Sequence, residues 1–432
     1  MVLRAVAFAV LVGQTVANSY VPPRGIDVAR RHGGNWSQKS TGDDGRLSAG
    51  NPHTQDGPLL GNADLSAVLQ FDRSGSVFSY YVTKTDAWST NDIFGLGVVT
   101  LEIPALNGSS QLFIRQDLGS ATTVIDANTS APDDSTASGV AVSMSSFIAA
   151  TTNIMSTSIS ITTPSATQLV VANAVYSGVR YETDPKTRMP TGAPARTLAN
   201  CTDFDNNGVR NRGPHNAGFA AADADAMWGL YIQCTKGNRE ASRLGLATRI
   251  LTPSAADVTL SAPECGPISQ RSGLMSSCTT TINVPAGTTE LTVLSSSLSN
   301  INMAGDGTPG PQTTLENVEE LRKATVALIG SATPATVLNL QSEHAQWWAE
   351  FWNASAVSFP SQPDFEAYYY RSMHLLGSST RQTSAVPPGL CGAWFAGGGP
   401  SRYGDFTLNY NFGEWFWLRY CVSYYSVRID PK

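Results

Sequence analysis

The fold class is decided by the stretch Ala67-Val-Leu-Gln-Phe71, Asp72-Arg-Ser-Gly-Ser76, Val77-Phe-Ser-Tyr-Tyr-Val82. Two short runs rich in β-branched and aromatic residues flank five turn-forming residues, which is the pattern of a β-hairpin. Similar runs recur up to residue 298 between Gly, Pro, Asn, Asp and Ser turns, at 98–103, 112–115, 169–176, 228–234 and 291–294. Ile159 and Ile161 alternate with serines, as on a half-buried antiparallel strand. The sequence therefore predicts a large antiparallel β-sandwich over residues 57 to 300.

The pattern changes after residue 300. Residues 304 to 311 are a linker by composition, and Thr313-Thr-Leu-Glu316 is a capping box that predicts the start of a helix ending before Gly330. Apolar residues at helical spacing predict two more helices, over about 335 to 352 and from about 363 to Gly377. We therefore expect a linker with helices over residues 301 to 362 and the beginning of an α-helical domain over residues 363 to 432.

Length and charge limit the classes of function. A chain of 432 residues exceeds one ordinary core and predicts two or more domains. Only 14% of its residues are charged, and Ser, Thr, Gly and Asn take their place, as is typical of an extracellular surface. The net charge of -6 leaves no basic stripe to meet phosphates, which excludes a nucleic-acid partner.

The first residues have the pattern of a signal peptide over residues 1 to 17. Arg4 supplies the positive charge, an apolar run follows from Ala5 to Val12, and Ala17 ends a small-residue cleavage site. A buried N-terminal strand is the alternative interpretation. The run is shorter than the roughly 20 residues that cross a bilayer. We therefore expect a secreted protein without a membrane span, with residues 18 to 56 as a lead-in to the sandwich.

Sequons and cysteines agree with export. Five N-x-S/T sequons are predicted glycosylation sites in a eukaryotic secreted protein: Asn35, Asn107, Asn128, Asn200 and Asn353. The six cysteines show no CxxC spacing, so a zinc site is not expected. In an oxidising compartment they are disulfide candidates, and Cys265 with Cys278 closes the shortest loop.

Two motifs near the C-terminus carry the candidate chemistry. Residues 387 to 394 read PPGLCGAW and residues 403 to 411 read YGDFTLNYN. An L-x-G-x-W element followed by N-x-N resembles glycoside hydrolase family 95. So do Leu60-Gly-Asn62 and Lys84-Thr-Asp-Ala-Trp-Ser89 within the predicted sandwich, and the helical stretches 344–352 and 365–378. The resemblance extends from about residue 57 to about residue 412.

The resemblance implies a sandwich domain followed by an (α/α)6 catalytic barrel. It implies a glycosidase of the α-L-fucosidase or α-L-galactosidase type that works with inversion on terminal sugars of glycans and uses no cofactor. Most of that barrel, with its catalytic glutamate and aspartate, would lie beyond Lys432, so we expect a truncated and impaired or inactive catalytic domain. Glu414 is a poor substitute acid because it lies three residues after Asn411, whereas an inverting pair of carboxyl groups needs ~6.5–9.5 Å across the sugar.

The N-x-N element also has a physical interpretation. Residues i and i+2 of an extended segment point to the same face, so Asn409 and Asn411 would present two amides to one volume. Amide oxygens accept hydrogen bonds from water and can orient it for attack on a sugar carbon. The resemblance implies this catalytic role for both residues. The alternative is a pair of loop asparagines that cap turns.

Aromatic and polar residues around this element are the candidate substrate-binding residues: Trp394, Tyr403, Asp405 and Trp415. An aromatic face packs against the apolar face of a pyranose, although core packing is an equal alternative for each ring. A structural role is favoured for Asp86 and Trp88. Residues 203 to 208 resemble a calcium loop, but Pro214 stands where the bidentate Glu belongs, so a solvated turn is favoured and no metal site is predicted.

Two other functions compete with the glycosidase. One is a non-catalytic secreted carbohydrate-binding protein in which the sandwich alone acts, and the other is an inactive fragment.

Overall fold

The computed structural model describes residues 24–37, 57–71, 76–89, 92–106, 111–129, 139–176, 179–183, 190–197, 216–223, 226–234, 240–252, 257–270, 273–300, 315–354, 356–381, 393 and 394. The predicted signal peptide and the capping-box threonines lie outside these residues. Among them, no helix is both long and apolar enough to cross a membrane.

Within this described part, one sheet has nine antiparallel strands. Their order is β1 (Asn35–Ser37), β6 (Gln111–Asp117), β7 (Thr122–Asn128), β8 (Ala141–Ile148), β9 (Ile154–Thr163), β19 (Gly287–Ser299), β15 (Glu240–Leu251), β14 (Met227–Cys234) and β13 (Asn216–Ala222).

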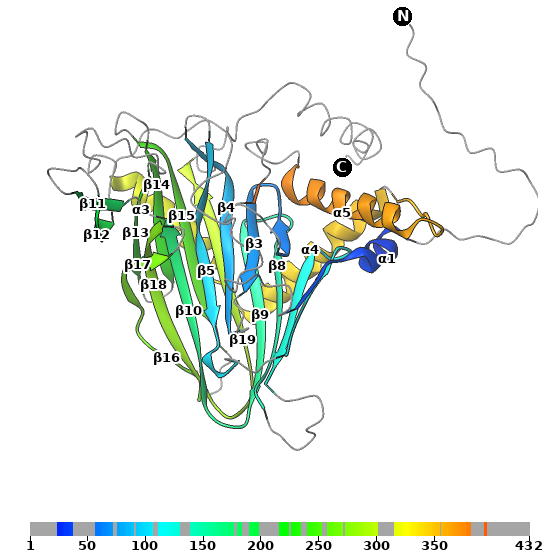
Figure 1. Ribbon diagram of the computed structural model, residues 1–432, viewed down its shortest axis with the longest axis horizontal. Coiled ribbons are helices and arrows are strands. Elements are labelled where there is room, and N and C mark those ends of the chain that lie inside the picture. Colours follow the sequence, from blue (N-terminus) through cyan, green and yellow to red (C-terminus); the bar gives the residue numbers. More distant parts are fainter. Residues whose placement is uncertain are drawn as a thin grey trace, which may run out of the picture.

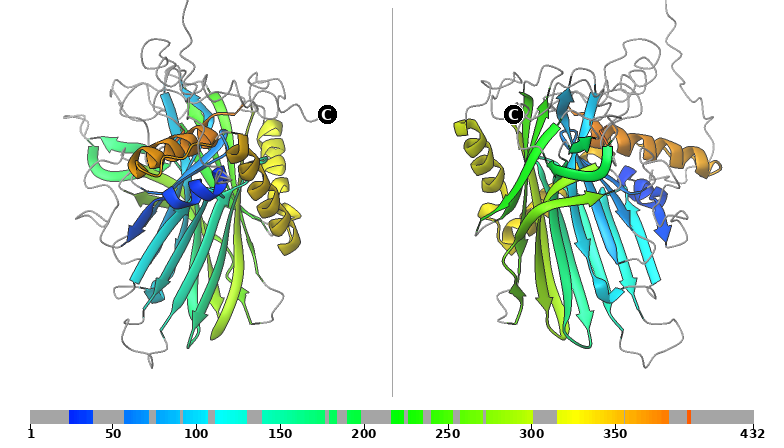
Figure 2. Two further views of the ribbon diagram at one scale, coloured as in Figure 1. Left: turned by 90° about the vertical axis from the view of Figure 1, so that its right-hand side faces the viewer. Right: turned by 60° about the vertical axis from the view of Figure 1, so that its left-hand side comes forward.

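The second large sheet has eight described strands. Seven follow the order β16 (Thr259–Leu260), β18 (Gly273–Val284), β10 (Thr167–Tyr176), β5 (Asp92–Glu102), β4 (Val77–Ser89), β3 (Leu65–Phe71) and β2 (Leu59–Gly61), and β17 (Glu264–Gln270) also pairs with β18. A separate ribbon joins β11 (Val179–Thr183) to β12 (Pro190–Thr197). The two large sheets lie face to face (Figures 1 and 2).

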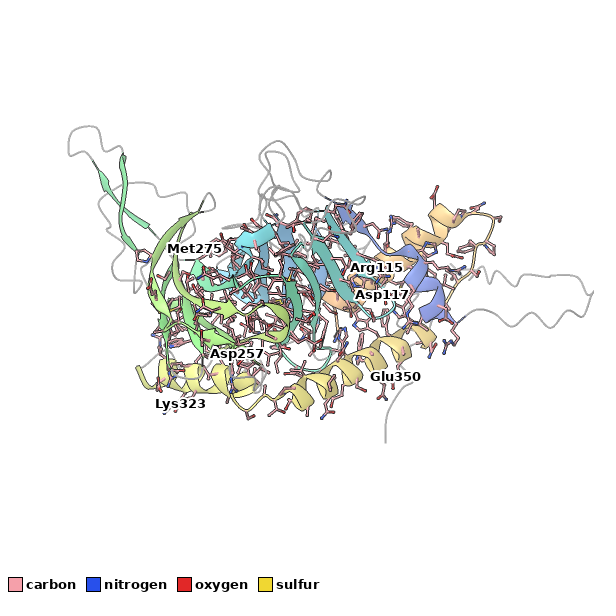
Figure 3. All side chains as sticks on the ribbon, turned by 90° about the horizontal axis from the view of Figure 1, so that it is seen from below. Arg115, Asp117, Asp257, Met275, Lys323 and Glu350 are labelled. Carbon is pink, nitrogen blue, oxygen red and sulfur yellow. A yellow bond between two sulfur atoms is a disulfide. The ribbon has the colours of Figure 1, made fainter. Side chains whose placement is uncertain are left out.

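The predicted antiparallel sandwich is confirmed. Its main hydrophobic cluster contains side chains from both sheets, among them Phe78 and Leu101 from one and Ile125 and Ile161 from the other. Side chains alternate between buried and outward-facing along β6 and β7, as expected for strands with one covered face. Figure 3 shows side chains filling the space between the sheets.

The hairpin predicted at residues 67 to 82 is formed by β3 and β4. The two strands pair antiparallel from Leu65 opposite Lys84 to Phe71 opposite Phe78. Strand β4, however, continues to Ser89, well past the predicted end at Val82. The continuation begins Thr-Lys-Thr-Asp, a polar run that lacks apolar alternation and so gives no strand signal, yet all four of these side chains are buried.

Among the described residues after the sandwich there are three long helices: α3 (Leu315–Gly330), α4 (Pro334–Ala354) and α5 (Pro363–Ser379). Leu321 and Ile329 of α3 pack on apolar side chains of the nine-stranded sheet, and α4 continues along the same side (Figures 2 and 3). The helix α5 lies at one end of the sandwich (Figure 1), where Pro363 occupies its first turn with two acidic residues, as helix starts prefer. That α5 begins an (α/α)6 barrel stays a prediction.

Residues 24–37 of the lead-in pack on the sandwich and its helices. The short helix α1 (Gly25–Ala29) packs with Trp348 and Trp352 of α4, and η1 (Arg30–His32) follows it. Strand β1 pairs with β6, so the nine-stranded sheet includes residues that precede the expected sandwich boundary at residue 57. A three-residue strand is too short to show a period, which is why the sequence did not reveal it. One further short helix, η3 (Pro104–Leu106), follows β5.

Candidate functional site

Trp394 lies where the end of the sandwich meets the end of α5. Its indole is buried at 5% exposure, and Nε1 donates a hydrogen bond to the Leu60 carbonyl at 2.8 Å. Leu60 and Trp394 belong to two of the motifs on which the family 95 resemblance depends, and 334 positions separate them in the chain. As it stands, the indole contacts protein, and its substrate-binding role stays a prediction.

The segment Leu60–Asp64, here named the junction loop, organises this place. Asn62 holds the loop together because its Oδ1 accepts the backbone N–H groups of Asp64 at 3.1 Å and Leu65 at 2.8 Å. Ala63 adopts a φ of 74°, a conformation that L-residues seldom take, and the two Asn62 contacts flank it. The Asn62 side chain therefore contributes to the shape of the loop from within it.

The junction loop is bound to α5. The Ala63 N–H donates to the Ser378 carbonyl at 2.7 Å. A Cβ at Gly61 would come within 2.6 Å of the same carbonyl oxygen, so only glycine allows this approach. The end of α5 is thus placed against β2 by backbone contacts.

The turn between β8 and β9 joins the same assembly. Asn62 Nδ2 donates to the carbonyls of Ala149 at 3.0 Å and Thr152 at 2.9 Å. Arg381, just after α5, donates to the Ala150 carbonyl, and its guanidinium lies 3.7 Å from the centre of the Trp347 ring. Both large sheets therefore contribute to the junction.

A buried charge cluster of Asp64, Lys84 and Asp86 lies next to the junction loop. Lys84 Nζ donates to Asp64 Oδ1 at 2.5 Å and to Asp86 Oδ2 at 3.0 Å. Asp86 Oδ2 also accepts from the Ser299 hydroxyl of the opposite sheet, and Asn153 Nδ2 donates to Asp64 Oδ2 at 2.6 Å. Lys84 and Asp86 are both completely buried. Among the described residues, Asp86 Oδ1 has no hydrogen-bond partner.

In this cluster one cation, Lys84, faces two carboxylates. Lys84 and Asp86 are shielded from water, and Asp64 is partly exposed. Burial raises the pKa of Asp86, against the opposing effect of the Lys84 charge. Burial by itself would lower the pKa of Lys84, but Asp86 and Asp64 outweigh it and raise that pKa. Lys84 therefore stays protonated. The structure agrees with the structural role favoured for Asp86, because this carboxyl is inaccessible to a substrate.

Two histidines, His344 of α4 and His374 of α5, are buried between the helices and the sandwich. His344 Nε2 contacts the Ser120 carbonyl at 2.7 Å, so this nitrogen carries the proton. The His374 ring stacks on Trp348 with ring centres 5.3 Å apart. Burial lowers the pKa of His344 to about 4 and that of His374 to about 3. Both rings are neutral at pH 7.

The remaining predicted site residues lie outside the described residues: Asn409, Asn411, Tyr403, Asp405 and Trp415. Their catalytic and substrate-binding roles stay predictions. The calcium-loop resemblance at 203–208 and the side chain of Trp88 are also outside. In the described part of the chain, no group of three or more His, Cys, Asp or Glu side chains is placed to hold a metal ion.

The predicted disulfide and sequons can be located in part. Cys265 of β17 and Cys278 of β18 face each other across the strand pair and form a disulfide with a Cα–Cα distance of 4.0 Å. Asn35 in β1 and Asn353 in α4 are exposed, and Asn128 at the end of β7 is partly exposed. Asn107 and Asn200 lie outside the described residues.

The junction was not apparent from the sequence as a single place. The sequence did not predict a role for Asp64, Asn153 or Arg381, because each is an isolated polar residue outside the helices and strands. The one available signal was the polar run Lys84-Thr-Asp86 inside an otherwise apolar region, since charged residues are seldom buried unless they are paired.

No family model matches the sequence, and no curated protein matches it. Solved structures do show a likeness. A protein from the human microbiome assigned as a kojibiose phosphorylase gives a TM-score of 0.36 at 8% identity, over 74% of this chain and 36% of that one. A glycosyl hydrolase of family GH92 gives a TM-score of 0.36 at 11% identity, over 82% and 42%.

An α-mannosidase of family GH92 from Bacteroides thetaiotaomicron gives a TM-score of 0.31 at 10% identity, over 76% of this chain and 38% of that one. The chain thus spans well under half the length of each of these three proteins. At these identities and TM-scores the likeness transfers no activity to this chain.

Proposed function

We propose that this chain is a glycoside hydrolase-like protein that acts on terminal sugars of glycans, of the α-L-fucosidase or α-L-galactosidase type and with inversion, and that its activity is impaired or absent in these 432 residues. The proposal is carried by the convergence of motifs at the junction. Three of the stretches on which the family 95 resemblance depends are 60–62, 84–89 and 387–394. Residues of all three lie in or beside the junction loop, linked by the hydrogen bonds of Leu60 and Lys84.

This convergence has a chemical meaning. A glycosidase needs an attacking water held in place relative to the sugar. Trp394 is seated on the sandwich, and Asn409 and Asn411 follow it by 15 and 17 positions. In the proposal, the sandwich fixes the start of the segment in which these two amides orient the water, and Trp394, Tyr403, Asp405 and Trp415 bind the sugar.

Export is part of the proposal. It is supported by the signal-peptide pattern of residues 1 to 17, by the Cys265–Cys278 disulfide and by the exposed sequons at Asn35 and Asn353.

The experiment is an assay of the 432-residue protein on fucosylated and galactosylated oligosaccharides, with proton NMR to follow the anomer that is released first. Because Glu414 is a poor acid for an inverting pair, we expect weak turnover at most, with inverted stereochemistry, and its loss in Asn409→Ala and Asn411→Ala. The matched control is Asn283→Ala, which removes an exposed asparagine from β18. Undiminished turnover in both active-site variants would refute the roles assigned to them, and glycan binding without any turnover would favour a carbohydrate-binding protein.

A further inference from the structure

The buried charge cluster is an unusual feature of this sandwich. Taking the Lys84 ammonium and the Asp86 carboxylate fully out of water, and the Asp64 carboxylate partly, is costly, and apolar residues of similar volume often replace such a group with no loss of stability. Stability alone therefore gives no reason for Asp64, Lys84 and Asp86 to be there. Their charge-assisted hydrogen bonds, however, depend on the angle between donor and acceptor, so they fix the orientation of the groups that they bind.

What the cluster holds is the junction loop, through Asp64. The Asp64 side chain is bound on both oxygens, by Lys84 at 2.5 Å and by Asn153 at 2.6 Å. Its backbone is bound on both sides as well, because its N–H donates to Asn62 and its carbonyl accepts from the Thr85 N–H at 2.9 Å. Asp64 is thus held in one orientation. Lys84 and Thr85 of β4 bind it on one side, and Asn62 and Asn153 bind it on the other.

The fixed loop in turn holds two elements of the proposed catalytic domain. One residue before Asp64, the Ala63 N–H binds the last turn of α5. Four residues before it, the Leu60 carbonyl binds the Trp394 indole. Lys84, inside the sandwich, is therefore connected to Trp394 by two hydrogen bonds, at Asp64 and at Leu60, and by the backbone of residues 60 to 64 between them.

We propose that Lys84 and Asp64 are positioning residues: they set the placement of Trp394 and of the end of α5 for substrate binding, without touching the substrate. The inference rests on the proposed function insofar as Trp394 contacts sugar. Asp86 assists by holding Lys84 Nζ from its second side and by linking it to Ser299 of the opposite sheet.

The test compares three variants of the full chain. Lys84→Met removes the ammonium and keeps an unbranched side chain. Asp86→Asn keeps an oxygen that can accept from Lys84 Nζ and Ser299 Oγ. Tyr80→Phe is the matched control, because it deletes the buried Tyr80–Ser146 hydrogen bond of the same strand, 2.7 Å long, and leaves the junction loop untouched.

Two measurements are made at a temperature where all variants are folded. Hydrogen exchange reports on the Ala63 amide, which is protected only while the loop is bound to α5, and kinetics report kcat and KM on the oligosaccharide. In Lys84→Met we expect exchange at Ala63 to rise by about tenfold or more and KM to rise by about tenfold, with a smaller change in kcat. Asp86→Asn, which keeps the hydrogen bonds but removes one compensating charge, should change both measurements in the same direction as Lys84→Met but less, whereas Tyr80→Phe should stay within about twofold of wild type.

The outcomes separate the two proposals. Unchanged Ala63 protection in a folded Lys84→Met protein would overturn the positioning role, whatever the kinetics show. Equal loosening of the loop in Tyr80→Phe would also overturn it, because the effect would then be general destabilisation of β4. A wild-type protein that neither binds nor turns over the oligosaccharides would refute the proposed function and would leave the exchange result to decide the positioning role on its own.

Discussion

Acidification should weaken this fold through His344 and His374. Both side chains are buried at 2% exposure, His344 beside Phe147 of the sandwich and His374 against Trp348. Arg381 lies over Trp347 in the same region, and its charge also opposes protonation of both rings. Among the described residues, His344 Nδ1 and His374 Nε2 have no hydrogen-bond partner, so a proton added there would be buried without an acceptor.

The sign and size of the effect follow from linkage. The folded-state pKa values, about 4 and about 3, lie below the ordinary value of 6.5, so the unfolded chain binds more protons. The stability that the neutral rings contribute is fully present above pH 6.5 and is lost as the pH falls towards 4. Between pH 7 and pH 5 each histidine should lower the free energy of unfolding by about 2 kcal/mol, and the two together by about 4 kcal/mol.

The assay is urea unfolding at pH 7 and pH 5, followed by tryptophan fluorescence. The comparison is between the wild type and the double variant His344→Gln, His374→Phe. Glutamine keeps an N–H donor for the Ser120 carbonyl, phenylalanine keeps a ring against Trp348, and neither titrates. Carboxylates contribute equally to both proteins, so the difference between the two pH dependences isolates the histidines. We expect the double variant to lose about 4 kcal/mol less than the wild type on acidification. Equal losses in the two proteins would refute the reasoning.

Three further predictions concern the junction and the disulfide. Gly61→Ala should lower the free energy of unfolding by about 1–3 kcal/mol, because the added Cβ would clash with the Ser378 carbonyl of α5. Gly266→Ala is the control and should be neutral, because its added Cβ meets nothing within 4 Å. Equal stabilities of the two variants in urea unfolding would contradict this prediction. Trp394→Phe should cost about 1–3 kcal/mol in the same assay by leaving the buried β2 carbonyl unpaired, and a neutral result would show that this hydrogen bond contributes nothing. Replacing Cys265 and Cys278 together by serine should cost roughly 3 kcal/mol, and non-reducing peptide mapping of the wild type should recover the two cysteines linked.

The sandwich could be predicted because its signal is local. Parts of strands such as β6 and β9 alternate apolar and polar residues, so each of these strands can be recognised without the others. The helices α3, α4 and α5 were predicted for the same reason, and the Cys265–Cys278 pair because its loop is short. The sequence did not predict β1, which is too short to show a period, or the second half of β4, which is too polar to show one.

The junction could not be predicted because its signal is not local. Asn62, Asn153 and Arg381 become related only when three turns from distant parts of the chain meet, and polar residues in turns are ordinary in any sequence. The motif Leu60-Gly-Asn62 was noticed through the family resemblance, but its roles as an acceptor for Trp394, a close approach to α5 and a clamp on the β8–β9 turn appear only in space.

The helix α5 is held at both of its ends by segments remote in sequence. Near its start, Glu366 is buried at 5% exposure and accepts hydrogen bonds from His32 at 2.7 Å and from the Phe359 N–H at 2.6 Å. At its end, the Ser378 carbonyl accepts from the junction loop at 2.7 Å. A helix fixed at both ends can neither slide nor pivot on the sandwich without breaking buried hydrogen bonds. The chain therefore leaves α5 from a determined position, and Trp394 is held again on the sandwich 15 residues after Ser379.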